Sequence, residues 1–187
     1  MKIDGNEIRP GNLIQHQGRL WLAVKTQHTQ PGKGGAYMQV ELKDVRDGTK
    51  MNTRFRAGES VERARLDEAA YQFLFEDQGM LTLMDQTTYE QTTVSKDLLG
   101  ESAPFLQEGM ILTVAFFDEE VISVRLPETV VMEVLEADPV VKGQTASASY
   151  KPARVENDVR VMVPPHITTG TRIVINTADG TYVERAK

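Results

Sequence analysis

The sequence predicts an all-β protein built from small barrels. Short segments in which apolar and polar residues alternate recur along the chain, and such alternation is typical of half-buried strands. Turn residues separate these segments at intervals of about ten residues, as they do in β-sandwiches and barrels. A parallel sheet would need long crossover helices between its strands, and the sequence offers only one short helical segment.

Two alternating segments near the N-terminus are the clearest strands. Residues 20–26 (LWLAVKT) and 36–42 (AYMQVEL) alternate at every second position, which places alternate side chains on one face. Trp21 is interpreted as a core or half-buried residue of its strand rather than as a stacking site. The predicted apolar faces are Leu20, Leu22 and Val24 in the first strand, and Ala36, Met38, Val40 and Leu42 in the second.

Asp-Gly pairs mark hairpin turns between later strands. They occur in RDGTK (46–50) and in ADGTY (178–182), and Asp-Gly between alternating segments is a strong hairpin signal. One short helix is predicted at 96–109, where Gly100 and Pro104 interrupt it. The other predicted strands are 50–56, 71–76, 80–84, 110–117, 121–126, 129–136, 159–163, 171–176 and 181–185.

Charge divides the chain into three segments. The net charge is −6, yet residues 1–65 contain 12 lysines and arginines against 7 acids. Residues 66–128 contain 2 against 13, and residues 129–187 contain 7 of each. These steps predict three domains with the same boundaries, although solvated faces can also differ in charge by chance. A basic first domain on an acidic protein favours a partner that is anionic on one side.

A weak internal repeat supports the last boundary. One segment, GMILTVAFFDEEVISVRL, begins at Gly109 and reaches Asp118; the other, GTRIVINTADGTYVERA, begins at Gly170 and reaches Asp179 at the same spacing. Each predicts a strand, a tight turn and a second strand. Either this is ordinary hairpin sequence, or residues 66–128 and 129–187 are two copies of one barrel.

The sequence lacks the residue patterns of catalytic and metal sites. It has no cysteine, its three histidines have no zinc-motif spacing, and no G-x-S-x-G serine motif occurs. No enzyme, metal or cofactor is therefore predicted. No apolar run reaches the ~18 residues of a membrane helix, and the N-terminus has no apolar signal segment. The expected compartment is the cytoplasm. The histidines are His16, His28 and His166.

A glycine-rich loop, QPGKGGAY (30–37), joins the two N-terminal strands and carries one cation, Lys33. It does not match a phosphate-binding P-loop, because Gly34 follows the lysine where serine or threonine is needed. The third glycine of a dinucleotide-binding loop is also missing. We interpret the loop as a hairpin tip with Pro31-Gly32 at the centre of a type II turn. Lys33 is then either a binding or modification site, or an incidental lysine on a flexible turn.

Several segments together resemble the bacterial elongation factor P family. PGKGGA (31–36) is similar to the tip loop of its first domain, and KPARVENDVRVMVPPHITTG (151–170) is similar to its C-terminal signature. ADPVVKGQTAS (137–147) and YVERAK (182–187) also resemble the family, so the similarity covers essentially the whole chain. The signature is matched at Lys151, Ala153, Val163, Pro164, Ile167 and Gly170, and Asp158 stands where the family has glycine.

The resemblance implies a fold and a function. The fold is a KOW-like, SH3-type barrel followed by two OB-fold barrels, in an L shape similar to tRNA. The implied function is a monomeric translation factor that binds the 70S ribosome between the P and E sites, without contact to a membrane. There it would act on peptidyl-tRNA stalled at consecutive prolines. Ribosomal RNA catalyses that reaction, so missing catalytic residues are expected.

The resemblance also implies roles for single residues. The tip lysine, Lys33, would reach toward the peptidyl-transferase centre, and a lysine-modifying enzyme would extend it, with β-lysylation favoured. Tyr182 and Arg185 match positions near the anticodon stem of the P-site tRNA, although Tyr182 can also be an ordinary half-buried strand residue. The rest of the tip loop is Pro31, Gly32, Gly34 and Gly35, and the loop facing the E-site mRNA codon is Gly143, Gln144, Thr145 and Ala146, with Gln144 in place of an acid.

Other classes of function remain open at this point. OB-fold barrels commonly bind single-stranded nucleic acid, so a free-standing RNA-binding module or chaperone is one alternative. It would need a basic barrel face, whereas residues 66–128 are the most acidic part of the chain. A paralogue with altered specificity is a second alternative, against which the intact PGKGG tip argues, and an enzyme is a third.

Overall fold

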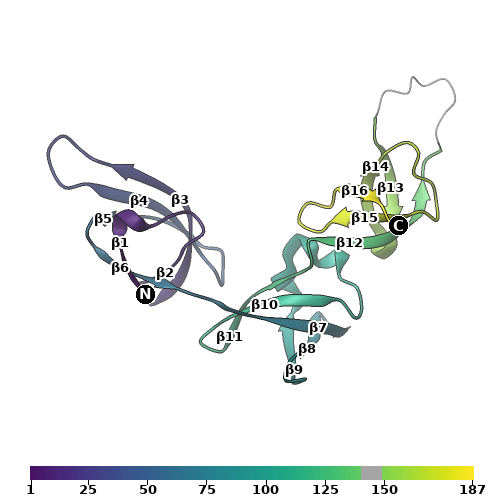
Figure 1. Ribbon diagram of the computed structural model, residues 1–187, viewed down its shortest axis with the longest axis horizontal. Helices are drawn as coiled ribbons and strands as arrows, with labels where there is room; N and C mark the ends of the chain where they lie inside the picture. Colours follow the sequence, from purple (N-terminus) through teal and green to yellow (C-terminus); the bar gives the residue numbers. More distant parts are fainter. Residues whose placement is uncertain (140–148) are drawn as a thin grey trace. The chain divides into compact units, whose positions relative to one another are not determined.

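The computed structural model describes residues 1–139 and 149–187. Strands dominate this part of the chain, and the predicted all-β fold class is confirmed (Figure 1). Contacts divide the chain into two compact units: Met1–Asp67 with Phe116–Ile122, and Glu68–Ala115 with Ser123–Lys187. Within the described residues, no helix is long and apolar enough to cross a membrane.

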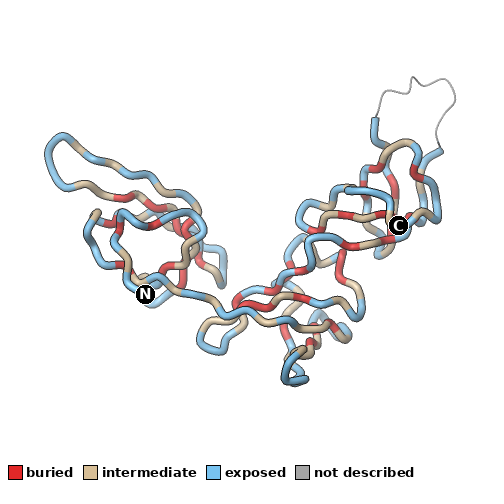
Figure 2. Tube along the Cα trace, viewed as in Figure 1, coloured by how far each residue is buried: buried red, intermediate tan, exposed pale blue. Residues whose placement is uncertain are grey.

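The first sheet belongs to the first unit and has the order β1-β6-β2-β3-β4-β5. Buried positions, red in Figure 2, recur along its strands. Ile14, Val40 and Leu42 are fully buried. Its elements are β1 (Lys2–Asp4), the 3-10 turn η1 (Gly5–Glu7), β2 (Leu13–His16), β3 (Arg19–Thr29), β4 (Tyr37–Asp44), β5 (Lys50–Arg56) and β6 (Ser60–Ala64).

The second and third sheets have equivalent strand orders, β11-β10-β7-β8-β9 and β16-β15-β12-β13-β14. The repeated segments that begin at Gly109 and Gly170 therefore occupy equivalent positions, β10-β11 and β15-β16. The second sheet contains β7 (Asp67–Asp77), β8 (Met80–Asp85), β9 (Gln91–Ser95), η2 (Lys96–Phe105), β10 (Ile111–Phe117) and β11 (Glu120–Arg125). The third contains β12 (Thr129–Ala137), β13 (Lys151–Val155), η3 (Glu156–Asp158), β14 (Val159–Val163), β15 (Arg172–Asn176) and β16 (Tyr182–Arg185).

Each sheet has the same pair of backbone hydrogen bonds at the bend of its long strand. A glycine with positive φ donates its backbone N–H to the carbonyl of one strand residue, and the residue after the glycine accepts that strand residue's N–H. The donor–acceptor pairs are Gly11–Ala23 (2.8 Å) with Ala23–Asn12 (2.8 Å), Gly109–Phe73 (2.9 Å) with Phe73–Met110 (2.8 Å), and Gly170–Val134 (2.8 Å) with Val134–Thr171 (2.8 Å).

A β-bulge lies at each of these sites. The register shifts between Ala23 and Lys25 in β3, and it shifts after Phe73 in β7 and after Val134 in β12. A bulge increases the local bend and twist of a strand. The backbone pairs hold the bend in place, so one long strand can follow the curl of its sheet.

Burial in β3 corrects one prediction. The core residues Trp21 and Ala23, 3% and 1% exposed, belong to the other alternation from the predicted Leu20, Leu22 and Val24, of which Leu20 is buried and Leu22 and Val24 are half-buried. The interpretation of Trp21 as a core residue is confirmed. In β4, the inward face of Met38, Val40 and Leu42 is also confirmed.

Other predicted elements differ in detail. The predicted strands all exist, but β1, β2, β6, β9 and β13 were not predicted. The predicted helix is a 3-10 segment, Lys96–Phe105, which Gly100 kinks with φ 56° and ψ −133°. Asp158 has φ 59°, a left-handed conformation that glycine adopts without a steric penalty. This conformation explains the glycine that the resembled family has there.

The β4-β5, β8-β9 and β15-β16 hairpins have five-residue loops with a common geometry. In the β4-β5 loop the Asp44 carboxylate accepts from the N–H of Arg46 at 2.7 Å, and the Gly48 N–H donates to the Asp44 carbonyl at 3.0 Å. The β8-β9 loop repeats this pattern from Asp85 and the β15-β16 loop from Asn176. The N–H groups of Thr87 and Thr88 lower the pKa of the Asp85 carboxyl, because hydrogen bonds favour its charged form.

The glycines at the bulges predict selective losses of stability. Gly170 has φ 88°, and a Cβ there would meet no atom within 4 Å, so the only cost of alanine is its disfavoured backbone conformation. We expect Gly170→Ala to lower the free energy of unfolding by about 1 kcal/mol. Gly58→Ala is the matched control, because Gly58 also has open space but no positive φ. Equal losses in urea unfolding would contradict this account of the bend.

Candidate nucleic-acid interface

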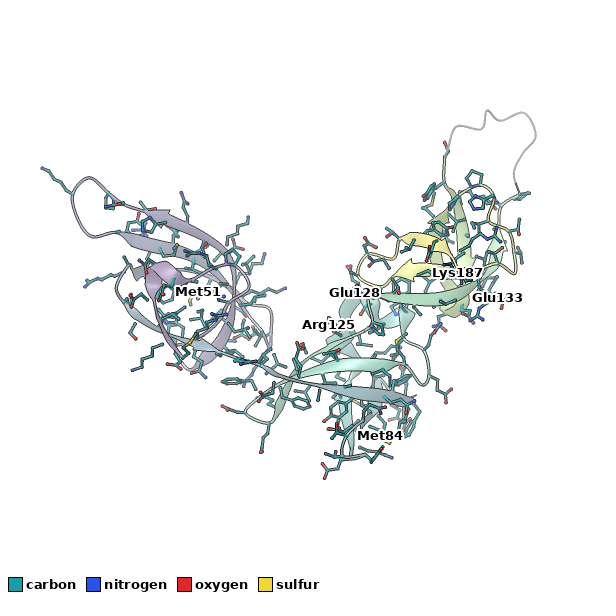
Figure 3. All side chains as sticks on the ribbon, viewed as in Figure 1. Met51, Met84, Arg125, Glu128, Glu133 and Lys187 are labelled. Carbon is teal, nitrogen blue, oxygen red and sulfur yellow. The ribbon has the colours of Figure 1, made fainter. Side chains whose placement is uncertain are left out.

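The outer surface of β3-β4-β5 is built by strand alternation. Met38, Val40 and Leu42 point into the core, so the residues between them point outward. Met51 packs on the core side of β5 (Figure 3). Residues that pair across strands share a face, and the outward rows are Thr29–Tyr37–Arg56, Gln27–Gln39–Arg54, Lys25–Glu41–Asn52 and Leu22–Lys43–Lys50.

This surface, called here the cationic face, is strongly basic. Its five cations are all solvent-exposed, and its one acid, Glu41, lies 3.8 Å from Lys50 Nζ. The Arg54 guanidinium lies 4.8 Å from the centre of the Tyr37 ring, a cation–π contact that limits its motion. Exposed cations among amide side chains suit the phosphates of a nucleic acid. The cations are Lys25, Lys43, Lys50, Arg54 and Arg56.

A cavity of about 710 Å³ adjoins one end of the cationic face. Tyr37, Arg54 and Arg56 line it together with Gly35, Ala36 and one acid, Glu59. The cavity therefore connects the arginines of the face to the base of the tip loop. The Ala36 carbonyl accepts the Ala57 N–H at 3.0 Å, which fixes this base to the end of β5.

The tip loop joins β3 to β4, and Lys33 is exposed there among exposed glycines. No described residue forms a hydrogen bond or an ion pair with its ammonium group. The predicted type II turn at Pro31-Gly32 is wrong, because that turn needs a positive φ at Gly32 and the structure has none there. Gly34 has φ 112° instead, so the positive φ of the turn lies at the residue after Lys33.

Tyr182 and Arg185, the predicted anticodon-stem residues, lie at the two ends of β16 in the third sheet. Tyr182 is half-buried, and its ring meets Tyr150 edge-to-face with centroids 6.4 Å apart. Tyr150 is 51% exposed, so the more accessible ring is one that sequence reasoning missed. Arg185 is exposed on the strand that carries Tyr182. The predicted codon loop, Gly143, Gln144, Thr145 and Ala146, lies outside the described residues.

Histidine and acidic side chains are the metal ligands to consider beside this surface. Residues 1–139 and 149–187 contain no group of histidine and acidic side chains that could hold a metal ion. His16 packs edge-to-face on Phe55 with centroids 5.2 Å apart, a position inside the first barrel. Taken with the curled sheets, the cationic face defines a class of protein, a multi-domain β protein with a basic surface suited to an anionic partner.

Comparisons with known proteins identify the family. A KOW-like domain of elongation factor P matches residues 4–61, its OB domain matches residues 66–124, and its C-terminal domain matches residues 130–185. The elongation factors P of Zymomonas mobilis and Parvibaculum lavamentivorans are 60% and 58% identical to the chain over 186 residues, covering both partners fully. The chain belongs to the elongation factor P family and is a translation elongation factor.

The fold has solved counterparts beyond the family. Eukaryotic translation initiation factor 5A from Methanococcus jannaschii matches 68% of this chain and 92% of its own, with a TM-score of 0.57 and 20% identity. A factor of the same family from Naegleria fowleri matches 67% of this chain and 98% of its own, with a TM-score of 0.53 and 11% identity. The predicted combination of a KOW-like first domain and OB-fold domains is confirmed.

The charge of the cationic face predicts the salt dependence of ribosome binding. Replacing Arg54 and Arg56 by glutamate should weaken binding and reduce the slope of log affinity against log salt by about 1–2, since each lost phosphate contact removes just under one unit. The same double reversal at Arg63 and Arg65 is the control, because these exposed residues lie off the face.

Co-sedimentation with ribosomes at several salt concentrations measures this slope. The account would be contradicted if the slope is unchanged in the Arg54 and Arg56 variant but is lost on charge reversal within residues 129–187. The salt-sensitive contact would then lie in the third sheet and not on the cationic face.

Proposed function

We propose that this factor binds the 70S ribosome between the P and E sites and accelerates peptide-bond formation at consecutive prolines. The observation that carries the proposal is Lys33, exposed at the tip of a loop whose base adjoins the cationic face. A chain that binds RNA by this face would hold its lysine at a fixed distance from the bound phosphates. The partners on the ribosome are ribosomal RNA and the P-site peptidyl-tRNA.

The contribution to the reaction is positional. Proline is a poor substrate when the acceptor end of the tRNA and the nascent chain sample unproductive geometries, and holding them reduces the entropic part of the barrier. The Lys33 ammonium would pair with phosphates near the acceptor end, while Gly32, Gly34 and Gly35 leave room for RNA on both sides. Ribosomal RNA carries out the chemistry, so the factor itself is not an enzyme.

The remaining assignments belong to the same proposal. The domains are residues 1–65, 66–128 and 129–187, and the factor acts as a monomer in the cytoplasm. Tyr182 and Arg185 would meet the anticodon stem by stacking and by phosphate pairing. The Gly143–Ala146 segment would face the E-site mRNA codon, with the Gln144 amide in place of a carboxylate.

A lysine-modifying enzyme would extend Lys33 by β-lysylation, which adds a second amine beyond the reach of the lysine itself. The isolated position of Lys33 supports this, since no neighbouring side chain blocks an enzyme. The mass of the proteolytic fragment that contains Lys33 tests the modification directly.

Lys33 should control rate and not folding. We expect Lys33→Ala to change the free energy of unfolding by less than about 0.5 kcal/mol, because the side chain is exposed and unpaired. The same change should remove most of the acceleration across a Pro-Pro-Pro segment in a reconstituted translation system. Lys33→Arg should also be impaired, since guanidinium has a different geometry and is not a substrate for amine-extending enzymes. Full rescue by the Lys33→Ala protein would show that the lysine is incidental.

The conformation of Gly34 gives a second test of the tip. Gly34→Val should slow Pro-Pro-Pro synthesis more than Gly32→Val, because valine cannot adopt φ 112° without strain. Gly32 has no positive φ and no atom within 4 Å of its Cβ direction, so it is the matched control for added bulk. Equal effects of the two variants would mean that width alone, and not the path of the backbone, matters.

A further inference from the structure

The outer face of β13-β14 carries a charge arrangement that the fold does not need. Arg154 and Arg160 are direct partners in the antiparallel ladder, and like charges at such positions destabilise a sheet. Both side chains point outward, because Ala153, Val155 and Val161 are buried. A pair that costs stability in the free protein calls for a compensating anion.

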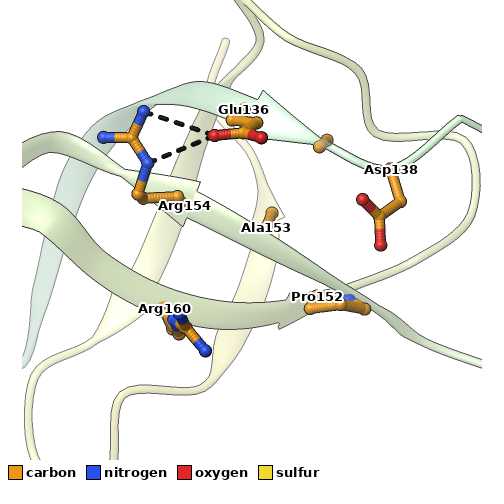
Figure 4. A pocket seen from close by; sticks show the side chains of 7 residues that line it. Glu136, Asp138, Pro152, Ala153, Arg154 and Arg160 are labelled. Carbon is orange, nitrogen blue, oxygen red and sulfur yellow. Dashed lines mark hydrogen bonds and ion pairs between the residues drawn. The ribbon is translucent and has the colours of Figure 1, made fainter.

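The acids nearby compensate only one of the two arginines. Arg154 lies 3.4 Å from a Glu136 carboxylate oxygen (Figure 4). It also lies 3.5 Å from an Asp158 oxygen, and both acids are largely exposed. Arg160 has no hydrogen bond or ion pair to any described residue. The guanidinium of Arg160 is therefore the available cation of the pair.

A cavity of about 230 Å³ lies beside the two arginines (Figure 4). Arg154, Arg160 and Pro152 line it together with Ala137, Ala153 and two acids, Glu136 and Asp138, so its charged side chains are two cations and two carboxylates. Pro152 pairs with Met162 across the same ladder. Each lies two residues from the neighbouring arginine on the same outward face, about 7 Å along the strand. Met162 is 52% exposed. A cationic pair thus lies next to a small apolar platform.

We propose that this surface binds one nucleotide of single-stranded RNA, with its phosphate on Arg160 and Arg154 and its base on Pro152 and Met162. A phosphate alone would use only the arginines, and a carboxylate-bearing peptide would not need the platform. The base of a duplex is stacked and paired, whereas a single strand can turn its base toward a protein surface. The inference rests on the proposed function, since a ribosome-bound factor meets single-stranded RNA.

Site-resolved titration of the isotope-labelled full chain tests the proposal. The probe is a uridine oligomer of about 12 nucleotides, and the amide signals of β13-β14 are fitted separately from those of β4-β5. We expect saturable shifts in β13-β14, and we expect Arg160→Gln to weaken the affinity fitted there by about fivefold while leaving the β4-β5 affinity unchanged. Arg172→Gln is the control, because Arg172 pairs across the ladder with Glu133 and does not line the cavity.

Three results would overturn the proposal: equal affinity in the Arg160→Gln protein, equal shifts with inorganic phosphate at the same phosphate concentration, or equal binding of an RNA duplex. Met162→Ser should weaken binding of the oligomer but not of inorganic phosphate. Stability supplies an independent readout, because Arg160→Gln should raise the Tm by about 1 °C through loss of repulsion. A lower Tm would mean that the pair is structural.

The translation assay separates this inference from the proposed function. Arg160→Gln should raise the factor concentration needed for half-maximal rescue at Pro-Pro-Pro without lowering the maximal rate, whereas loss of Lys33 lowers the maximal rate. If the titration fails while Lys33 still controls the rate, only the nucleotide site is wrong. If Lys33 has no effect, the proposed function is wrong whatever the titration gives.

Discussion

One extra residue in β3, Val24, determines which side chains of the first sheet face outward. Ala23 pairs with Leu42, and the next pair joins Lys25 to Glu41, so the bulge reverses the alternation of the strand. Before the bulge, Trp21 and Ala23 point into the core. Beyond it, Lys25 and Gln27 point outward, although they continue the same odd-numbered series. Without the bulge, Lys25 would point into the barrel, at a high cost in desolvation.

The backbone pair between Gly11 and Ala23 connects this reversal to the rest of the molecule. It fixes the bend that lets β3 leave the core and continue toward the tip loop, and the same pair recurs at Phe73 and Val134. In the first sheet the device has a functional consequence, because the outward half of β3 completes the cationic face. The position of Lys33 then follows from backbone geometry, since no described residue forms a hydrogen bond or an ion pair with its side chain.

Sequence reasoning recovered the elements whose signal is local. Alternation located β4 and its inward residues, and Asp-Gly pairs located two hairpins. Two of the failures share a physical origin, because a bulge and a turn type both depend on hydrogen bonds that the local sequence does not specify. Val24 looks like a regular strand residue, and nothing in PGKGG indicates that positive φ falls on Gly34 rather than on Gly32. β13 was missed because Pro152 reads as a strand breaker.

The site was predictable in part. Lys33 stood out because it is the only cation in a bare loop, and the charge count pointed to residues 1–65. The individual members of the cationic face could not be chosen, since pairing of β3, β4 and β5 decides which cations share a surface. The pairing of Arg154 with Arg160 could not be predicted either, because only the register of β13 and β14 sets them opposite each other.

The central claim is that the cationic face of the first sheet is the surface turned toward RNA on the ribosome. The chain has no cysteine, so a single cysteine can carry an iron chelate that cleaves nearby RNA. A chelate on Asn52→Cys, which lies on the face, is expected to cleave P-site tRNA near its acceptor end and the adjacent ribosomal RNA. A chelate on exposed Ser60 in β6, off the face, should cleave much less. Equal cleavage from Ser60→Cys, or none from Asn52→Cys, would contradict the claim.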